Sequence, residues 1–138
     1  MNYKHSVPAQ LRFSDVDRFS HVNNSVYFSL FDMAKTQYFR DVFQMEVFDD
    51  IAMVVGSLEA NFLSPILFTE EIDIQTSIVR LGNKSFTLNQ RAINSRTQEV
   101  KCECKTNMVM FDTIHKTTTP IPDIYRKRAK DFEGENLL

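Results

Sequence analysis

The chain has 138 residues, the size of one domain, and a domain of that size buries about 70% of the surface that its unfolded chain exposes. Such a core needs neither a disulfide nor a metal. The chain has 16 Lys and Arg against 18 Asp and Glu, and the resulting net charge of -2 argues against non-specific binding to nucleic acid. No stretch approaches the ~20 apolar residues of a membrane span, and the N-terminus lacks the apolar core of a signal peptide, so we expect one cytoplasmic domain over residues 1–138.

The first part of the chain predicts one strand followed by one long helix. Residues 7–15 predict a strand, in which Leu11 and Phe13 alternate with Arg12 and Ser14 as is typical of a half-buried strand. From Ser25 to about Phe43, apolar side chains recur at spacings of three and four residues, which predicts a helix of roughly five turns. Asn23, Asn24 or Ser25 is expected as its N-cap.

Nearly everything after residue 50 predicts β-structure. Gly82 and Asn83 give a hairpin signal between two of the expected strands. The last strand places Lys101 and Lys105 on the face opposite its apolar side chains, so half of that strand should be half exposed. The expected elements are strands over residues 51–62, 71–81, 85–93 and 99–111, and a short basic helix over residues 123–130.

The order of these elements predicts an α+β fold in which one long helix packs on a five-stranded antiparallel sheet. A single helix covers only one face of such a sheet, so the sheet edge or outer face should be covered by a second subunit. Twelve Phe with no Trp is an aromatic excess that points the same way, to an interface or an apolar pocket.

Residues 12–27 are the segment where we expect the chemistry. Asp17, His21 and Asn24 lie between a strand and a helix N-terminus, which presents unpaired N–H groups and a partial positive charge. This arrangement suits a developing oxyanion, with Asp17 close enough to attack or to direct a water. Taken alone, Asp17 is more often a turn residue and His21 a hydrogen-bonding residue, and Asp15 is expected to pin the loop.

Other kinds of site find little support. His5, His21 and His115 are scattered and do not converge with the cysteines, so no metal or cofactor is expected. Three Gly exclude a Gly-rich phosphate loop, and no Gly-x-Ser-x-Gly run occurs. Cys102 and Cys104 share one face of a strand but cannot easily bridge, which indicates two core thiols.

A small basic cluster lies around the predicted hairpin. It consists of Arg80, Lys84 and Arg91. Two interpretations remain open for it: contact with phosphate groups, or hairpin charge that is simply solvated.

A longer pattern carries a resemblance to a known family. It reads Arg12-x-x-Asp15-x-Asp17-x-x-x-His21-Val22-Asn23-Asn24-x-x-Tyr27, with Phe31-Asp32 one turn further on. It resembles the acyl-CoA thioesterases of the 4-hydroxybenzoyl-CoA thioesterase type and the acyl-carrier-protein thioesterases of fatty acid synthesis. Weaker similarities follow in residues 61–65 and 82–86.

The resemblance implies a hotdog fold, in which a long helix is wrapped by an antiparallel sheet. It also implies a homodimer or homotetramer with active sites at the subunit interface, and an acyl-CoA or acyl-carrier-protein substrate. By position, Asp17 matches the nucleophile or general base, and Asn24 the residue whose backbone N–H polarises the thioester carbonyl. Lys84, with its neighbours Arg80 and Ser85, matches the hairpin that meets the CoA phosphates in some members.

One departure from the family pattern bears on the mechanism. His21 matches an auxiliary residue of the carrier-protein branch, which usually has Asn where this chain has Phe19. This difference favours an Asp-plus-backbone site over a three-residue one. A hotdog dehydratase, which typically carries a His-Phe-Pro run, fits less well because Val22 follows His21, and a non-catalytic acyl-binding protein remains the other alternative.

Overall fold

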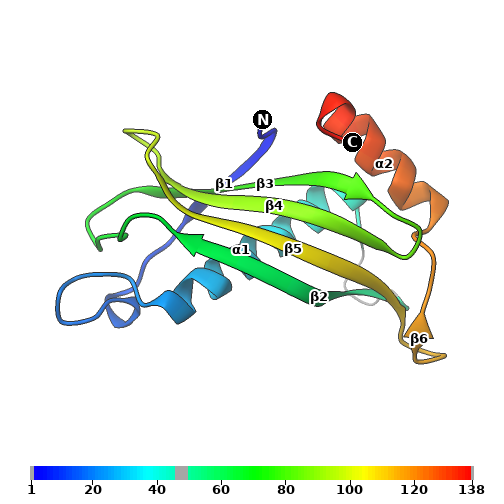
Figure 1. The fold of residues 1–138 in the computed structure, drawn as a ribbon, viewed down its shortest axis with the longest axis horizontal. Coiled ribbons are helices and arrows are strands. Elements are labelled where there is room, and N and C mark those ends of the chain that lie inside the picture. Colours follow the sequence, from blue (N-terminus) through cyan, green and yellow to red (C-terminus); the bar gives the residue numbers. More distant parts are fainter. Residues whose placement is uncertain (1, 46–49, 138) are drawn as a thin grey trace.

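The computed structural model describes residues 2–45 and 50–137, which form an α+β fold. Helix α1 (Asn24–Tyr38) runs behind the sheet in Figure 1, and α2 (Asp123–Glu133) lies at the opposite end of the molecule from the loop that precedes α1. The sheet is antiparallel, and its strands follow the spatial order β1 (His5–Ala9), β3 (Ile72–Leu81), β4 (Ser85–Asn94), β5 (Val100–Asp112) and β2 (Ile51–Phe62).

The five-stranded antiparallel sheet that the sequence predicts is confirmed, with one addition. A two-residue strand, β6 (Thr117–Thr118), pairs with the end of β5, so the sheet has six strands. The predicted hairpin joins β3 to β4, where the Gly82 N–H donates to the Ser85 carbonyl at 2.7 Å. Alternating side chains located β3, β4 and β5 well because these strands bury side chains against the core, whereas β2, which has no buried residue, was located by its apolar run.

The long helix is also confirmed, but its last turn changes type. After α1 the chain continues as a π-helical turn over Phe39–Phe43, so the helical segment ends where the sequence predicts. The face of α1 that packs on the sheet includes Leu30, Phe31 and Ala34. The spacing of three and four residues between them is the periodicity that identified the helix.

The first strand is shorter than predicted. Strand β1 ends at Ala9, and Phe13–Asp15 forms a 3-10 turn instead of extended chain. The cause is the buried Asp15, whose carboxylate accepts the Arg12 backbone N–H at 2.7 Å and the Arg12 guanidinium at 3.1 Å. The bond from the Arg12 backbone lowers the pKa of Asp15 and outweighs the opposing effect of burial. Asp15 therefore pins the loop, as expected.

The core has two apolar clusters between the sheet and the helices. One surrounds the first half of α1, and the other surrounds Phe43, whose ring lies 5.7 Å from that of Phe86 and 5.5 Å from that of Tyr125. Cys102 and Cys104 are buried free thiols, as predicted. Burial raises the pKa of the Cys102 thiol to about 12, which keeps it protonated and unreactive near neutral pH.

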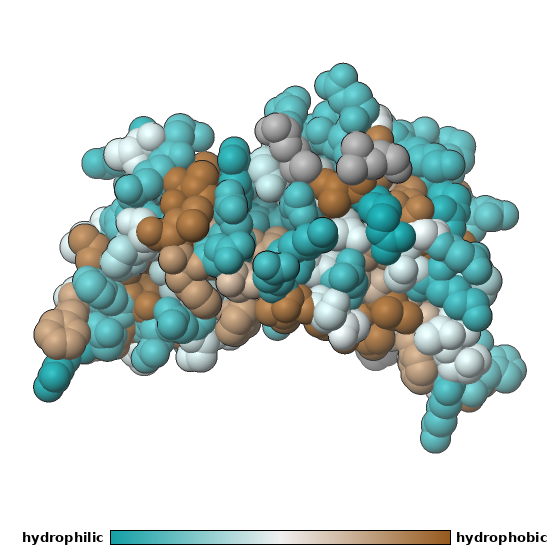
Figure 2. All heavy atoms as spheres, in the orientation of Figure 1, coloured by the Kyte–Doolittle hydropathy of each residue, from teal (hydrophilic) through white to brown (hydrophobic). Residues whose placement is uncertain are grey.

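Strand β2 leaves an apolar edge of the sheet exposed. Figure 2 shows brown, apolar side chains along the lower border of this face, over β2, and four side chains of this strand are at least 42% exposed: Val54, Val55, Leu58 and Phe62. A long apolar edge strand invites pairing with another chain. Within residues 2–45 and 50–137, neither helix has the length and apolar character that crossing a bilayer requires.

A buried carboxylate fastens α2 to the sheet. Glu133 is fully buried, and its Oε2 accepts the Ile78 backbone N–H at 2.9 Å and the Tyr38 hydroxyl at 2.5 Å. The Ser77 hydroxyl donates to Oε1 at 3.1 Å. Strand β1 starts at His5, which pairs with Thr76, so β1 does not extend to Ile78. Glu133 accepts the Ile78 N–H at this unpaired edge of β3. Burial and the Glu133 charge raise the pKa of Tyr38, which keeps the phenol neutral and able to donate.

Replacing Glu133 with alanine should therefore destabilise the protein by about 3 kcal/mol or more, because it orphans several buried donors at once. Urea unfolding followed by circular dichroism measures this change. Glu135→Ala, in the exposed turn that follows α2, is the matched control and should be near neutral. Equal stability of the two variants would show that Glu133 does not anchor α2.

Candidate active site

Asp17 closes a tight turn with its own carboxylate. Its Oδ1 accepts the backbone N–H groups of Phe19, at 2.8 Å, and His21, at 3.2 Å. The turn is completed by the Ser20 N–H, which donates to the Asp17 carbonyl at 2.9 Å, while Ser20 adopts a φ of 62°. Among the described residues, no donor reaches the second oxygen, Oδ2. Asp17 is thus a turn residue that still has one carboxylate oxygen available.

Two neighbouring segments hold this turn in place. The Val22 N–H donates to the Ile66 carbonyl at 2.8 Å, and the Phe68 N–H donates to the Ser20 carbonyl at 3.1 Å. On the other side, the Asn23 N–H donates to the carbonyl of the buried Asp15 at 2.9 Å. Hydrogen bonds therefore hold the Asp17 turn between the loop that follows β2 and the 3-10 turn at Phe13–Asp15.

A pocket of about 340 Å³ opens beside the turn. It is lined by Asp17, His21, Val22, Asn23, Asn24, Tyr27, Phe62, Leu63, Ser64 and Pro65. The structure thus brings together the three residues that the sequence singled out for chemistry, Asp17, His21 and Asn24. It also adds a wall from the end of β2 that the site prediction did not include, although residues 61–65 carried a weak family similarity.

The wall contributed by β2 is aromatic. The Phe62 ring meets the Tyr27 ring edge to face at 5.2 Å and the Phe28 ring at 6.4 Å. The Tyr27 hydroxyl accepts the Ile66 N–H at 3.3 Å, and burial raises the pKa of Tyr27, so this side chain is a neutral phenol. The pocket therefore combines an apolar wall with a carboxylate and an imidazole.

The N-terminus of α1 also faces this pocket. Asn24 is the first helical residue, and Asn23 is the N-cap, in an extended conformation and without a side-chain hydrogen bond to the helix. The first N–H groups of a helix have no partner within the helix and carry partial positive charge. They are suited to an anionic oxygen, and no side chain of the N-cap competes for them.

The predicted phosphate-binding residues lie elsewhere. Arg80 donates to the Thr87 hydroxyl at 3.1 Å and to the Ser85 hydroxyl at 3.3 Å, beside Lys84 in the β3–β4 hairpin. This hairpin lies at the right of Figure 1 and the pocket loop at the left. On β5, Cys102 pairs with Phe62 at the end of β2, and Val109 pairs with Ser85 in the hairpin. About 23 Å of strand therefore separates the hairpin from the pocket.

Arg91 does not belong to this hairpin cluster. It lies mid-strand in β4, stacks on the Tyr3 ring at 4.5 Å and donates to Gln75 at 2.6 Å. The hairpin residues Arg80, Lys84 and Ser85 are thus a separate group from Asp17, His21 and Asn24 within one protomer. Among the residues that the structure describes, no group of three His, Cys, Asp or Glu side chains is arranged to hold a metal ion.

Comparison with known proteins identifies the family to which this sequence and fold are similar. The family model described as the thioesterase-like superfamily matches residues 11–128. The fold superimposes on the PA5185 protein of Pseudomonas aeruginosa with a TM-score of 0.87, at 23% identity, covering 95% of this chain and 92% of that one. It also superimposes on a thioesterase of Thermus thermophilus, solved with coenzyme A and zinc, with a TM-score of 0.84, at 26% identity and 96% coverage of both chains.

A further match is to the Bacillus subtilis protein YsmA. The two sequences are 30% identical over 79 residues, which are 57% of this chain and 54% of YsmA. This chain therefore spans about half the length of the curated relative that it matches.

Proposed function

Because the chain belongs to the thioesterase-like superfamily, and its sheet and long helix form the hotdog fold of its structural neighbours, we propose that it hydrolyses acyl-CoA thioesters through the Asp17 pocket. The observation that carries this proposal is the meeting of three features in one pocket: the Asp17 carboxylate, the His21 imidazole and the uncapped N-terminus of α1.

In the proposed reaction, the carbonyl oxygen of the thioester lies against the backbone N–H of Asn24. That N–H, at the positive end of α1, stabilises the negative charge that develops on the oxygen. The available Oδ2 of Asp17 either attacks the carbonyl carbon or takes a proton from a water that attacks it. If water attacks, the carbon–sulfur bond breaks and the proton that Asp17 has taken passes to the leaving thiolate. If Asp17 attacks, the thiolate leaves an acyl–aspartyl anhydride, and water then hydrolyses the anhydride to the free acid and supplies the proton of the thiol.

His21 has an auxiliary part in this proposal. Its backbone N–H donates to the Asp17 carboxylate and its ring lines the same pocket, 6.4 Å from the Phe19 ring. Phe19 supplies no amide at the position where the carrier-protein branch has one. A mechanism that depends on Asp17 and a backbone donor fits these residues better than one that needs three side chains.

Coenzyme A is the proposed carrier because the Thermus thioesterase was solved with coenzyme A. The acyl-carrier protein remains the alternative carrier. A panel of acyl-CoA and acyl-carrier-protein thioesters, followed by release of free thiol, tests both. Binding of acyl-CoA without any turnover would instead support the non-catalytic acyl-binding alternative.

The proposed assembly is at least a homodimer formed through β2. Antiparallel pairing of β2 with the partner's β2 would cover the exposed Val55 and Leu58 and place the Ile51 end of one strand beside the Phe62 end of the other. The hairpin end of one protomer would then approach the catalytic pocket of its partner. This arrangement would bring Lys84 near a site that it does not reach within its own chain.

We therefore expect Lys84→Ala to raise KM for an acyl-CoA several-fold with little change in kcat. A residue that holds a remote phosphate binds the ground state and the transition state equally, so its loss affects KM alone. Steady-state kinetics measure the change, with Lys105→Ala on β5 as the control. An unchanged KM would move the phosphate site away from the hairpin or point to the carrier protein as the donor.

A further inference from the structure

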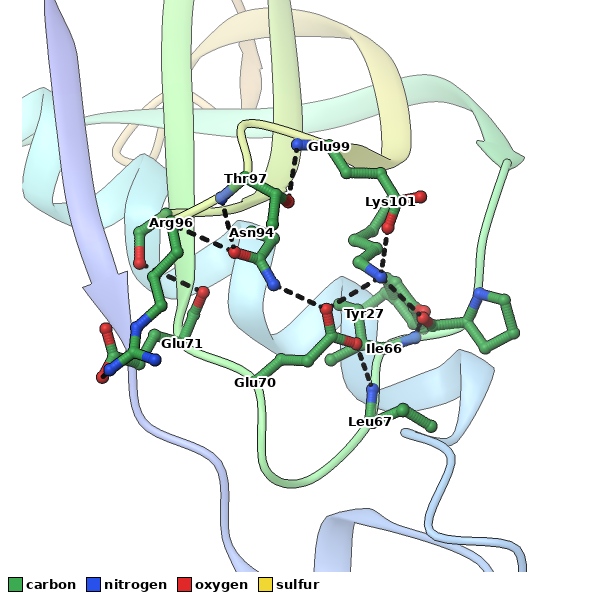
Figure 3. Close-up of polar contacts among 12 residues, drawn as sticks. Tyr27, Ile66, Leu67, Glu70, Glu71, Asn94, Arg96, Thr97, Glu99 and Lys101 are labelled. Carbon is green, nitrogen blue, oxygen red and sulfur yellow. Dashed lines mark hydrogen bonds and ion pairs between the residues drawn. The ribbon is translucent and has the colours of Figure 1, made fainter.

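Lys101 is a buried cation behind the pocket. The sequence predicts that it points to a half-exposed face of β5. Lys101 instead lies at a register shift, where Ala92 faces Cys102 and Ile93 faces Val100, and 6% of its side chain is exposed. Its Nζ lies 2.8 Å from Oε2 of Glu70 and 2.5 Å from Oε1 of Glu99 (Figure 3). Glu70 is half-buried, with 14% of its side chain exposed, whereas Glu99 is 54% exposed.

Lys101 contacts three consecutive residues of the pocket wall. Its backbone carbonyl accepts the N–H groups of Leu63, at 2.9 Å, and Ser64, at 3.1 Å. Its ammonium donates to the Pro65 carbonyl at 3.2 Å. All three of these wall residues line the pocket. The backbone carbonyl and the ammonium group of Lys101 thus both bind the segment from Leu63 to Pro65.

Glu70 holds the other end of the same loop. Its Oε1 accepts the Leu67 N–H at 2.9 Å, and its Oε2 accepts the Asn94 amide at 2.8 Å as well as Lys101. Burial raises the pKa of Glu70, but its hydrogen bonds to Lys101, Asn94 and Leu67 outweigh this and hold the pKa below its usual value. Burial likewise lowers the pKa of Lys101, and the bonds to Glu70 and Glu99 more than reverse that effect. Both groups are therefore charged near neutral pH.

The loop between these two anchors is the one that clamps the Asp17 turn. Its Ile66 carbonyl accepts the Val22 N–H, and its Phe68 N–H donates to the Ser20 carbonyl. Its Ile66 N–H donates to the Tyr27 hydroxyl, at the first turns of α1. A chain of direct contacts therefore runs from the ion pair, through Ile66 and Phe68, to both sides of the turn that presents Asp17.

We propose that Lys101 and Glu70 are positioning residues of the site: their ion pair fixes the loop after β2, and through it the placement of Asp17 relative to the N-terminus of α1. The activity part of this proposal rests on the proposed thioesterase function. A displacement of about 1 Å between reacting groups costs ~10²-fold in rate, so a loosened clamp should be visible in turnover. Removing Lys101 also leaves the carboxylate of Glu70 without its cation, with only 14% of its side chain exposed, which displaces the loop further.

The test is Lys101→Met, which keeps an unbranched side chain of similar length but removes the charge. The matched control is Lys105→Met, an exposed lysine four residues along β5 that pairs in register with Glu59 and lies outside the pocket lining. We expect kcat to fall at least tenfold in Lys101→Met with KM changed no more than about threefold, and neither constant to change in the control.

Amide hydrogen exchange, followed by nuclear magnetic resonance, gives a readout that does not depend on activity. We expect exchange at Val22 and Phe68, the donors that clamp the turn, to be at least tenfold faster in Lys101→Met, while Leu88 in the centre of β4 keeps its protection. Faster exchange at all three amides would show a general loss of stability and would overturn the positioning role. Unchanged exchange at Val22 and Phe68 would overturn it as well.

Glu70→Gln is the second variant, for the case in which Lys101→Met does not fold. It keeps an acceptor for the Leu67 N–H and removes the charge that pairs with Lys101. We expect the same selective exchange at Val22 and Phe68. If the wild-type protein hydrolyses no thioester, the proposed function fails, and the exchange result alone decides whether the ion pair positions the turn.

Discussion

Asp17→Asn should abolish most of the proposed thioesterase activity, lowering kcat by about 10²-fold or more. Asparagine keeps the size of the side chain and a carbonyl oxygen that accepts the N–H groups of Phe19 and His21, so the turn should persist. It loses the second carboxylate oxygen, which is the atom proposed to attack the thioester or to deprotonate water. Thiol release from a good acyl-CoA substrate measures the loss.

Two comparisons make this result specific. Asp131→Asn changes an exposed carboxylate that pairs with Lys127 on α2, and it should leave kcat unchanged. His21→Ala should lower kcat less than Asp17→Asn does, because Phe19 has no side-chain amide that would complete a three-residue site. Near wild-type turnover in Asp17→Asn would remove Asp17 from the mechanism and make His21 the next candidate.

Asn24→Pro should lower kcat by about 10²- to 10³-fold, the cost of one oxyanion donor in comparable sites. Proline has no backbone N–H, yet the first position of a helix tolerates it well. The preceding residue, Asn23, has φ of -63° and ψ of 140°, an extended conformation that proline accepts. The helix should therefore form while its proposed donor is absent.

Asn24→Ala is the control for that variant, because it removes the side chain and keeps the backbone N–H. We expect it to retain most of its activity, whereas Asn24→Pro does not, with equal helix content by circular dichroism. If both variants turned over substrate at the same rate, the oxyanion donor would have to be another group in the pocket.

The sequence by itself determined most of the sheet and singled out three residues that meet in one pocket. Strand β2 lies where alternation and apolar runs predict it, and the helical segment ends at Phe43 as its periodicity predicts. The Asp17, His21 and Asn24 cluster was also accessible, because all three lie within one short stretch before a helix. Patterns of this kind are local, so a single sequence records them.

The first strand shows where a local pattern misleads. Leu11 and Phe13 alternate with Arg12 and Ser14 as in a strand, yet the side chain of Asp15 bonds back to Arg12 and closes a 3-10 turn. Hydrogen bonds from a side chain to its own backbone compete with strand pairing, and periodicity alone does not register them.

Only the tertiary structure decided what surrounds the turn. Tyr27 meets Ile66 across 39 residues of chain, and Lys101 meets Pro65 across 36. The position of Lys101 in an alternating strand predicts exposure, because the pattern contains no information about the register shift at Lys101 or about the loop that contacts it. The family resemblance assigns Lys84 to the CoA phosphates, and the sheet holds it at the far end of the protomer from Asp17, so that role depends on the proposed second subunit. Contacts between distant segments depend on how the strands pair and where the loops cross them, and these are properties of the folded chain alone.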